Sequence, residues 1–240
     1  FTSQEELDKG ESSSVINQTF GDLIKALDRW PQCQGLVINP WDKRMILTKE
    51  SLEVVKRHVP KSHICFVRGS VLDLHVDAIV NAANSGMTGC YAPNHKCIDN
   101  CIHTFAGAQL RYECAQMMKA QGHEEPTGQA KITAAYNLPC RYVLHTVGPI
   151  IYGRVTEKDC ELLAGSYRSC LELAAQNHLE SVAFCCISTG EFHFPKERAA
   201  GIAVRTVRDF LQKETSVKKV IFNVFKDYDR EIYEHTLAKK

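Results

Sequence analysis

The sequence lacks the features that mark membrane, fibrous and nucleic-acid-binding proteins. Its apolar runs fall short of the ~18 residues that a membrane helix needs, and it contains no internal repeat and no low-complexity linker. The net charge is only +1, from 29 Lys and Arg against 28 Asp and Glu. No basic stripe interleaved with aromatic residues is present either, so we expect neither a nucleic-acid partner nor a membrane partner.

The cysteine content, 11 in 240 residues, is high but below the density of a disulfide scaffold, and the number is odd. Cys185 and Cys186 lie inside an apolar run, where thiols usually act as small buried hydrophobes. The chain opens with a polar stretch and not with a signal-peptide pattern. We therefore expect free thiols, a reducing compartment such as the cytoplasm, and some cysteines that are available to a metal.

The length of the chain allows one large domain, or one domain with an extension. Residues 1–60 are predicted to form an N-terminal helical extension. Apolar residues between Phe20 and Trp30 recur at helical spacing, and Thr48 can cap a second helix that ends at Pro60. Residues 61–240 are predicted to form one α/β domain.

After Pro60, short β-branched runs alternate with longer helical patterns. The predicted strands are 64–67, 78–81, 131–136, 142–147, 181–187 and 219–225. The predicted helices are 98–120, 158–178, 196–213 and 229–238. This alternation predicts a mostly parallel sheet with helices on both faces, and ligands in such sheets bind at the carboxyl ends of the strands.

Two asparagines follow the predicted strand 78–81 almost directly. Asparagine is depleted in strands, and its amide needs partners when buried. Both side chains could satisfy turn backbone, and for Asn81 that alternative is as good as a functional role. Asn84 lies further from the strand and is the better candidate for contact with a ligand hydroxyl.

Cys90, His95 and Cys97 fall close together on a loop and are of the residue types that zinc selects. Three protein ligands with an open fourth position is the pattern of catalytic zinc, whereas structural zinc normally has four. Chance in a cysteine-rich chain is the alternative. Cys101 and His103 are the nearest candidates for a fourth ligand, but a helix that starts near Cys97 would point both of them elsewhere.

Asp99 would then lie in the first turn of that helix. The helix dipole favours a carboxylate at this position, which is a sufficient structural reason for an aspartate. A general base beside a zinc site is the functional alternative.

Small residues with free backbone N–H groups follow the predicted strand 181–187 and precede a helix. Such loops suit phosphate, and the segment after His145 contains a similar loop at Gly148. The two loops could together hold a diphosphate. Phe192 and Phe225 lie near strand ends, where an aromatic ring is either core or a stacking surface. The first loop comprises Ser188, Thr189, Gly190, Glu191 and Phe192.

Taken together, these segments resemble the macrodomain family over about residues 62–236. The resemblance is carried by Arg68-Gly69-x-Val71, Val76 to Asn84, Gly128-x-Ala130, Leu138-Pro139, His145 to Pro149, Ile187 to Gly190, and Val224-Phe225. It implies a three-layer α/β/α fold with a mixed, mostly parallel central sheet, and ADP-ribose as the ligand.

The segment from Gly89 to Cys97 stands where MacroD-type hydrolases carry a glycine run, and it resembles the zinc-containing macrodomains of microbes. That resemblance implies Zn²⁺ at Cys90, His95 and Cys97, and catalytic roles for Asp99 and Asn84. The residues that it implies for ADP-ribose are Ser70, Val71, Asn84, Gly148, Ser188, Thr189, Gly190, Glu191, Phe192 and Phe225.

The implied activity is zinc-dependent hydrolysis that removes mono-ADP-ribose from protein side chains, with carboxylates as the expected linkage, and releases ADP-ribose. A lipoyl-carrier protein modified by a sirtuin-like transferase is the partner that the resemblance suggests. Two alternatives stay open: a non-catalytic ADP-ribose reader whose zinc only braces the loop, and a hydrolase of a small ADP-ribosyl metabolite.

Ser70 departs from the family, which usually has aspartate after Arg-Gly. A hydroxyl accepts a weaker hydrogen bond than a carboxylate, so we expect adenine binding to be weaker by about 1 to 2 kcal/mol at most.

Overall fold

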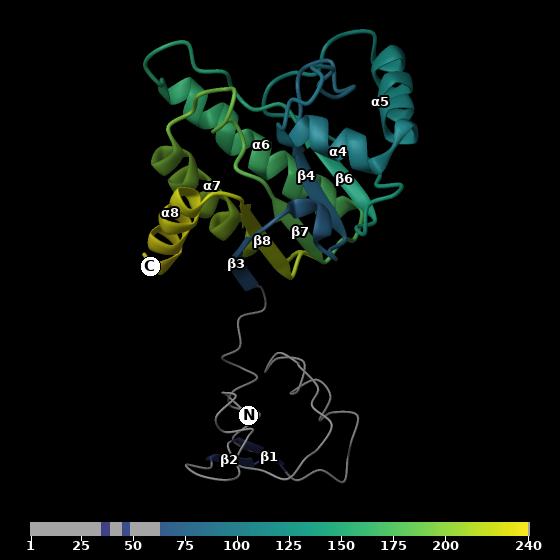
Figure 1. Cartoon of the computed structure of the whole chain (residues 1–240). Coiled ribbons are helices and arrows are strands. Elements are labelled where there is room, and N and C mark those ends of the chain that lie inside the picture. Colours follow the sequence, from purple (N-terminus) through teal and green to yellow (C-terminus); the bar gives the residue numbers. More distant parts are fainter. Residues whose placement is uncertain (1–34, 39–44, 49–62, 240) are drawn as a thin grey trace. The chain divides into compact units, whose positions relative to one another are not determined.

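The computed structural model describes residues 35–38, 45–48 and 63–239 (Figure 1). The chain divides into two compact units, residues 1–61 and 62–240. In the first unit, β1 (Gly35–Ile38) and β2 (Met45–Thr48) form an antiparallel pair. Helix was expected here, but short runs rich in Leu, Ile and Val favour strand pairing over an isolated helical turn. Thr48 is the last residue of β2. The predicted helices at 20–30 and after Thr48 lie outside the described residues.

The second unit contains a six-stranded sheet in the order β3-β8-β7-β4-β6-β5. Every neighbouring pair is parallel except β5 with β6, so the sheet is mixed and mostly parallel, as predicted. The strands are β3 (His63–Arg68), β4 (Ala78–Ala82), β5 (Ala130–Ala134), β6 (Tyr142–Thr146), β7 (Ser181–Phe184) and β8 (Lys219–Val224). All six predicted strands of this unit are present, although β7 ends three residues earlier than expected.

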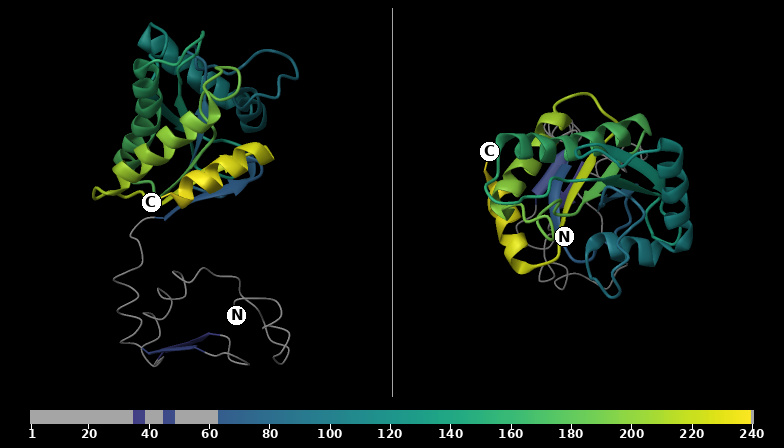
Figure 2. Two further views of the ribbon diagram at one scale, coloured as in Figure 1. Left: turned by 90° about the vertical axis from the view of Figure 1, so that its left-hand side faces the viewer. Right: turned by 90° about the horizontal axis from the view of Figure 1, so that it is seen from above.

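Helices cover both faces of the sheet (Figure 2). The helices α6 (Glu157–Gln176), α7 (Lys196–Leu211) and α8 (Asp227–Ala238) pack on one face, where Tyr167, Phe184 and Phe222 are buried together. The helices α4 (Ile98–Ala106) and α5 (Ala108–Gln121) cover the other face together with the 3₁₀ turn η1 (Val71–Asp73). These layers confirm the predicted three-layer architecture.

The predicted helix 98–120 is two helices, because Gly107 between them has φ +99°. Side chains avoid this left-handed region, and glycine enters it freely, so the chain turns here.

The strands alternate between the two layers with the period of two that a pleated sheet requires. In β4, Ala78 and Val80 face the layer of α6, whereas Ile79 faces the layer of α4 and α5. Asn81 therefore points toward α4. In β6, the same alternation turns Val143 and His145 toward α4 and α5. The polar residues of two adjacent strands thus meet under one helix layer.

The described part of the chain contains ten cysteines, all of them free thiols. None of the helices in this part is long and apolar enough to cross a lipid bilayer.

Candidate active site

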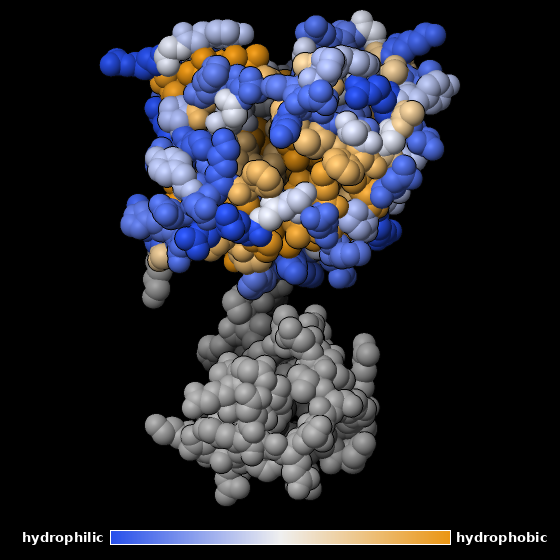
Figure 3. Space-filling view, viewed as in Figure 1, coloured by the Kyte–Doolittle hydropathy of each residue, from blue (hydrophilic) through white to orange (hydrophobic). Residues whose placement is uncertain are grey.

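A cleft of about 920 Å³ lies beyond the carboxyl ends of the parallel strands β3, β4, β7 and β8. In the space-filling view the centre of this unit is hollowed and its walls are largely hydrophobic (Figure 3). The predicted site residues that line the cleft are Ser70, Val71, Asn84, Cys90, His95, Cys97, Asp99, Ser188, Thr189, Gly190, Glu191, Phe192 and Phe225. The parallel strands bring these distant segments to one edge, as the sequence analysis expected.

Gly148 is the one predicted site residue that does not line the cleft. It lies behind the Ser188 loop, so close that a Cβ atom at this position would overlap the Ser188 hydroxyl. Gly148 therefore packs against the Ser188 loop, and its contact with a ligand stays a prediction.

The Asp99 carboxylate forms part of the cleft wall although its residue is only 5% exposed. Its two oxygens accept hydrogen bonds from two amides of the β4 segment. The Asn81 Nδ2 donates to Oδ1 over 2.8 Å, and the Asn84 Nδ2 donates to Oδ2 over 3.1 Å. Burial raises the pKa of the Asp99 carboxyl, whereas the Asn81 side chain, the Arg111 charge and the Asn84 backbone act against that rise. Asp99 is thus a fixed, largely desolvated carboxylate at the edge of a cleft.

Asn84 has structural partners in addition to Asp99. Its Nδ2 also donates to the Gly89 carbonyl over 3.2 Å, and its Oδ1 accepts from the Gly86 N–H over 3.0 Å. The side chain therefore braces the start of the Cys/His loop. The expected contact with a ligand hydroxyl remains a prediction and would have to use the remaining lone pair of Oδ1.

The loop between β4 and α4 brings Cys90, His95 and Cys97 together, with their ligand atoms all within 4.8 Å of one another. The Cys90 Sγ and His95 Nδ1 atoms are 3.3 Å apart. Two ligands at zinc's usual S and N bond lengths in a tetrahedral site are separated by about 3.6 Å. The donor set and its spacing therefore fit a zinc ion.

Several contacts hold this loop in place. Cys97 is the N-cap of α4, where its Sγ accepts from the Asn100 N–H over 3.4 Å. The Asn100 Nδ2 donates to the Cys90 carbonyl over 3.0 Å. On α5, Arg111 donates to the Thr88 carbonyl, and its guanidinium lies 4.4 Å from the centroid of the Tyr91 ring. The loop is anchored from both helices of its layer.

The ionisation of the loop residues follows from these contacts. Hydrogen bonds from the Ala92 backbone and from His95 lower the pKa of the Cys90 thiol. Burial raises the pKa of the Cys97 thiol to about 11, and the contact with Cys90 raises the pKa of His95. A metal ion would have to displace the Cys97 proton, which a bound zinc ion does readily.

Cys101 and His103, the candidates for a fourth zinc ligand, both lie outside the Cys/His cluster. Cys101 lines the cleft one turn along α4 but is outside the Cys/His cluster. His103 is buried behind Asp99, with 3.6 Å between its Nε2 and the Asp99 Oδ1. Across the cleft mouth, the Glu191 Oε1 lies 3.6 Å from the His95 Nε2. The cluster thus groups three potential metal ligands within the described residues, and all three line the cleft.

The loop from Ser188 to Phe192 has the chemistry of an anion site. Ser188 has φ +64°, and its buried hydroxyl oxygen has no hydrogen-bond partner in the described part of the chain. The backbone N–H groups of Gly190, Glu191 and Phe192 are likewise without a carbonyl partner among the described residues. Unpaired N–H groups on a loop before a helix attract phosphate oxygens.

Ser70 and Phe225 border the far end of the cleft. The Ser70 hydroxyl accepts from the Leu72 N–H over 3.2 Å and so caps η1. A hydroxyl oxygen has a second lone pair, which leaves an acceptor for a ligand. Phe225 follows β8 and is 74% exposed, so it is not core. Its open ring is suited to stacking.

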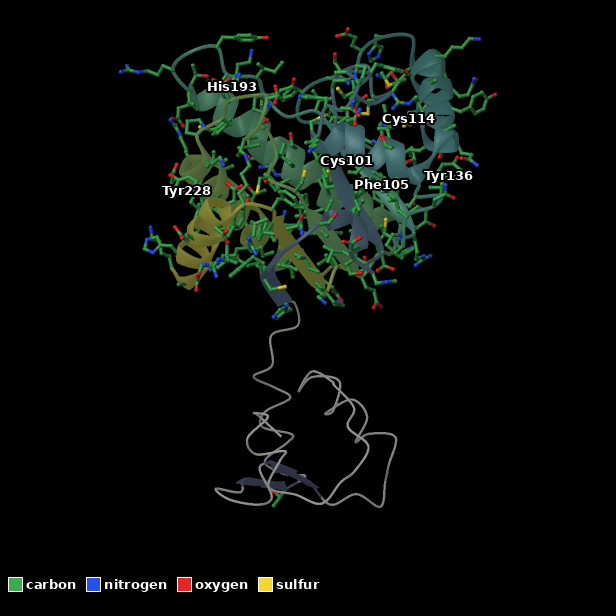
Figure 4. The ribbon with its side chains drawn as sticks, in the orientation of Figure 1. Cys101, Phe105, Cys114, Tyr136, His193 and Tyr228 are labelled. Carbon is green, nitrogen blue, oxygen red and sulfur yellow. The ribbon has the colours of Figure 1, made fainter. Side chains whose placement is uncertain are left out.

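Sequence reasoning missed a second polar cluster, under α4 and α5, which contains His103, Cys114 and His145. Figure 4 labels Cys114 on α5, on the same side of the sheet as Cys101 and Phe105 of α4. Burial lowers the pKa of His103 to about 4 and that of His145 to about 3. A histidine inside an apolar strand was a signal for His145, but only the strand register shows what it faces.

Comparison with known proteins gives consistent results. The Macro domain family profile matches residues 80–203. A protein-ADP-ribose hydrolase of Treponema medium is 64% identical over 171 residues, which are 71% of this chain and 66% of that protein. A protein-ADP-ribose hydrolase of Staphylococcus aureus strain MSSA476 is 46% identical over 88% of this chain and 79% of its own. The chain thus spans just under two thirds of the first relative and more of the second.

Among solved structures, a mutant Oceanobacillus iheyensis macrodomain determined with ADPR has a TM-score of 0.65 and 38% identity. The match covers 72% of this chain and 90% of that structure. The fold described above is therefore shared with a macrodomain that was determined with ADPR.

Proposed function

The chain belongs to the macrodomain family, and on that premise we propose that it is a zinc-dependent enzyme that removes mono-ADP-ribose from modified proteins. The observation that carries the proposal is the buried Asp99 carboxylate, held by two amides at the wall of a cleft of about 920 Å³. A pocket that only binds ADP-ribose does not need such a group. The names of the relatives from T. medium and S. aureus support the same activity.

Different residues of the cleft would bind different parts of ADP-ribose. The free N–H groups of the Ser188 to Phe192 loop would donate to the diphosphate oxygens. Phe225 would stack on the adenine, and the second lone pair of Ser70 would accept from its amino group. The ribose that carries the scissile bond would then lie near Asn84 and Asp99, since these residues line the remaining part of the cleft.

Asp99 would orient the attacking water and take up its proton. The amide hydrogen bonds fix the direction of the carboxylate, and burial raises its pKa, which makes it a better proton acceptor. A zinc ion at Cys90, His95 and Cys97 would supply Lewis-acid polarisation of an oxygen at the scissile linkage. The Glu191 carboxylate, on the far side of the His95 ring, would hold that ring in its ligating orientation.

The decisive experiment is incubation of the full chain with a carboxylate-linked mono-ADP-ribosylated protein, with and without a zinc chelator. We expect release of free ADP-ribose that the chelator abolishes and that Asp99→Asn reduces by at least about 100-fold. A lipoyl-carrier protein modified by a sirtuin-like transferase is a second acceptor to test, because the sequence resemblance suggests it.

Three other results would change the proposal. Full release in the presence of the chelator would leave a hydrolase without a catalytic metal. Tight ADP-ribose binding without release from either acceptor would favour a reader. Turnover of an acetylated ADP-ribose, but of no protein acceptor, would favour a metabolite hydrolase.

A further inference from the structure

A chain of buried polar side chains runs from the edge of the sheet to Asp99. Its members are Thr133 on β5, His145 on β6, Asn81 on β4 and Asp99 on α4. Each of the four residues is at most 5% exposed. Asn81 and His145 are direct cross-strand partners in the β4–β6 register and face the same layer. The sheet therefore sets their contact, without any contribution from a loop.

The chemistry of the paired groups fixes the direction of each hydrogen bond, because an amide NH₂ only donates and a carboxylate only accepts. The Asn81 Nδ2 lies 2.8 Å from the Asp99 Oδ1 and 3.1 Å from the His145 Nδ1. An amide NH₂ group has two hydrogens and donates both. His145 must then accept at Nδ1 and carry its proton at Nε2, which lies 2.9 Å from the Thr133 hydroxyl oxygen.

The same geometry argues against a metal ion at the neighbouring group of His103, Cys114 and His145. The in-plane direction at the His145 Nε2 is taken by Thr133 at 2.9 Å, whereas the Cys114 Sγ is 3.9 Å away. A zinc ion about 2 Å from Nε2 along that direction would collide with the Thr133 hydroxyl. The group is a hydrogen-bond network.

We propose that His145 is a positioning residue for Asp99. By accepting at Nδ1, it keeps the Nδ2 of Asn81 turned toward the carboxylate. The Asn81 Oδ1 is buried and has no partner among the described residues, so no contact there fixes the amide orientation. With the amide reversed, an oxygen would face Asp99 and repel it. This inference rests on the proposed hydrolase function, because it assigns His145 to the orientation of that enzyme's general base.

The tautomer is tested first and does not depend on activity. We expect ¹⁵N chemical shifts of the histidine-labelled full chain to show His145 protonated at Nε2 and not at Nδ1. His145→Asn identifies the signal by its loss. A resonance protonated at Nδ1 would overturn the proposal, since the Asn81 amide would then have to present its oxygen.

Kinetics test the consequence. His145→Phe removes the acceptor at similar size and should lower kcat about 10- to 100-fold, the usual range for a supporting hydrogen-bond partner. The Kd for ADP-ribose should stay within about threefold, because the ring does not line the cleft. His145→Asn places an oxygen near the Nδ1 position and should recover most of kcat.

Cys114→Ala is the matched control. It alters the same buried layer without touching Asn81, so it should leave kcat unchanged. A loss of kcat and of bound metal in this variant would support a metal site at His103, Cys114 and His145, and would overturn the assignment of this group as a hydrogen-bond network. Equal kcat in His145→Phe and the wild type would also overturn the positioning role.

If the wild-type chain releases no ADP-ribose at all, the proposed function fails by itself. The inference is then judged on a crystal structure of His145→Phe. A reversed Asn81 amide or a displaced Asp99 carboxylate would support it, and an unchanged arrangement of both would overturn it.

Discussion

The replacement His103→Leu should make the protein more resistant to acid. His103 is 2% exposed, and neither of its ring nitrogens has a hydrogen-bond partner in the described part of the chain. The ring faces Asp99 on its own helix, Arg111 and Cys114 on α5, and His145 on β6. Burial first, and then the Arg111 charge, lower the pKa of His103 to about 4. The folded protein therefore holds this histidine neutral at pH values at which the unfolded chain is protonated.

The sign of the effect follows from proton linkage. Between the folded pKa and the unfolded value, the unfolded chain binds more protons, so the free energy of unfolding falls as the pH falls. With an unfolded pKa of about 6.5, His103 lowers the free energy of unfolding by about 2 kcal/mol near pH 5 and has almost no effect on it near pH 7.5. Leucine does not titrate, and the two unpartnered nitrogens leave no orphaned partner behind. The free energy of unfolding of His103→Leu should thus be no lower than that of the wild type near pH 7.5, and its advantage should grow by about 2 kcal/mol toward pH 5.

The assay is urea unfolding of the full chain at both pH values, followed by far-ultraviolet circular dichroism. Both tryptophans of the chain precede residue 62, so tryptophan fluorescence would not report on this unit. Comparison between variants cancels the opposite contribution of His95, whose raised pKa favours folding at low pH. The exposed His75→Leu serves as the control for removing a histidine as such. The same stability difference at both pH values would refute a buried neutral His103.

Three further predictions concern the cleft. Cys97→Ser should lower the zinc content measured by atomic absorption, and retention of full zinc would remove Cys97 from the site. Asn100→Ala leaves the Cys90 carbonyl without its donor and should weaken zinc affinity about 10-fold in a chelator competition, with the Kd for ADP-ribose unchanged. Ser70→Asp should tighten ADP-ribose binding by about 1 to 2 kcal/mol in calorimetry, because a carboxylate accepts more strongly. An unchanged Kd would place the adenine elsewhere.

The sheet could be predicted because its strands are continuous apolar runs, which are typical of strands covered on both faces. Because parallel strands end at the same edge of the sheet, the polar segments that follow them were expected there. All but one of the predicted site residues line the cleft at this edge. Gly148 does not line the cleft for a physical reason. Its sequence resembles a phosphate loop, but the Ser188 loop packs in front of it, and local sequence does not determine which of two neighbouring loops lies in front.

The partners of Asp99 could not be predicted in the same way. The sequence alone did not show whether the Asn81 side chain satisfies turn backbone or has a functional role, because its contacts depend on which strand lies beside β4. The register puts it opposite His145, which is 64 residues away in the sequence. Such pairs follow from sheet order and alternation, and neither is visible in a single strand.

The positions of Cys97 and Asp99 tie the two halves of the site together. Cys97 caps α4 and lies beside Cys90 and His95 on the loop, and Asp99 follows in the first turn of the same helix. Asp99 is therefore held from two sides. The rigid β4 strand holds it through Asn81, and the loop holds it through the start of α4. A metal ion that draws Cys97 toward Cys90 would fix where α4 begins, and hence the direction of the carboxylate. On the proposed function, removal of zinc should then lower turnover in two ways, through the missing Lewis acid and through a less ordered Asp99, whereas the Asn81 amide on β4 stays in place.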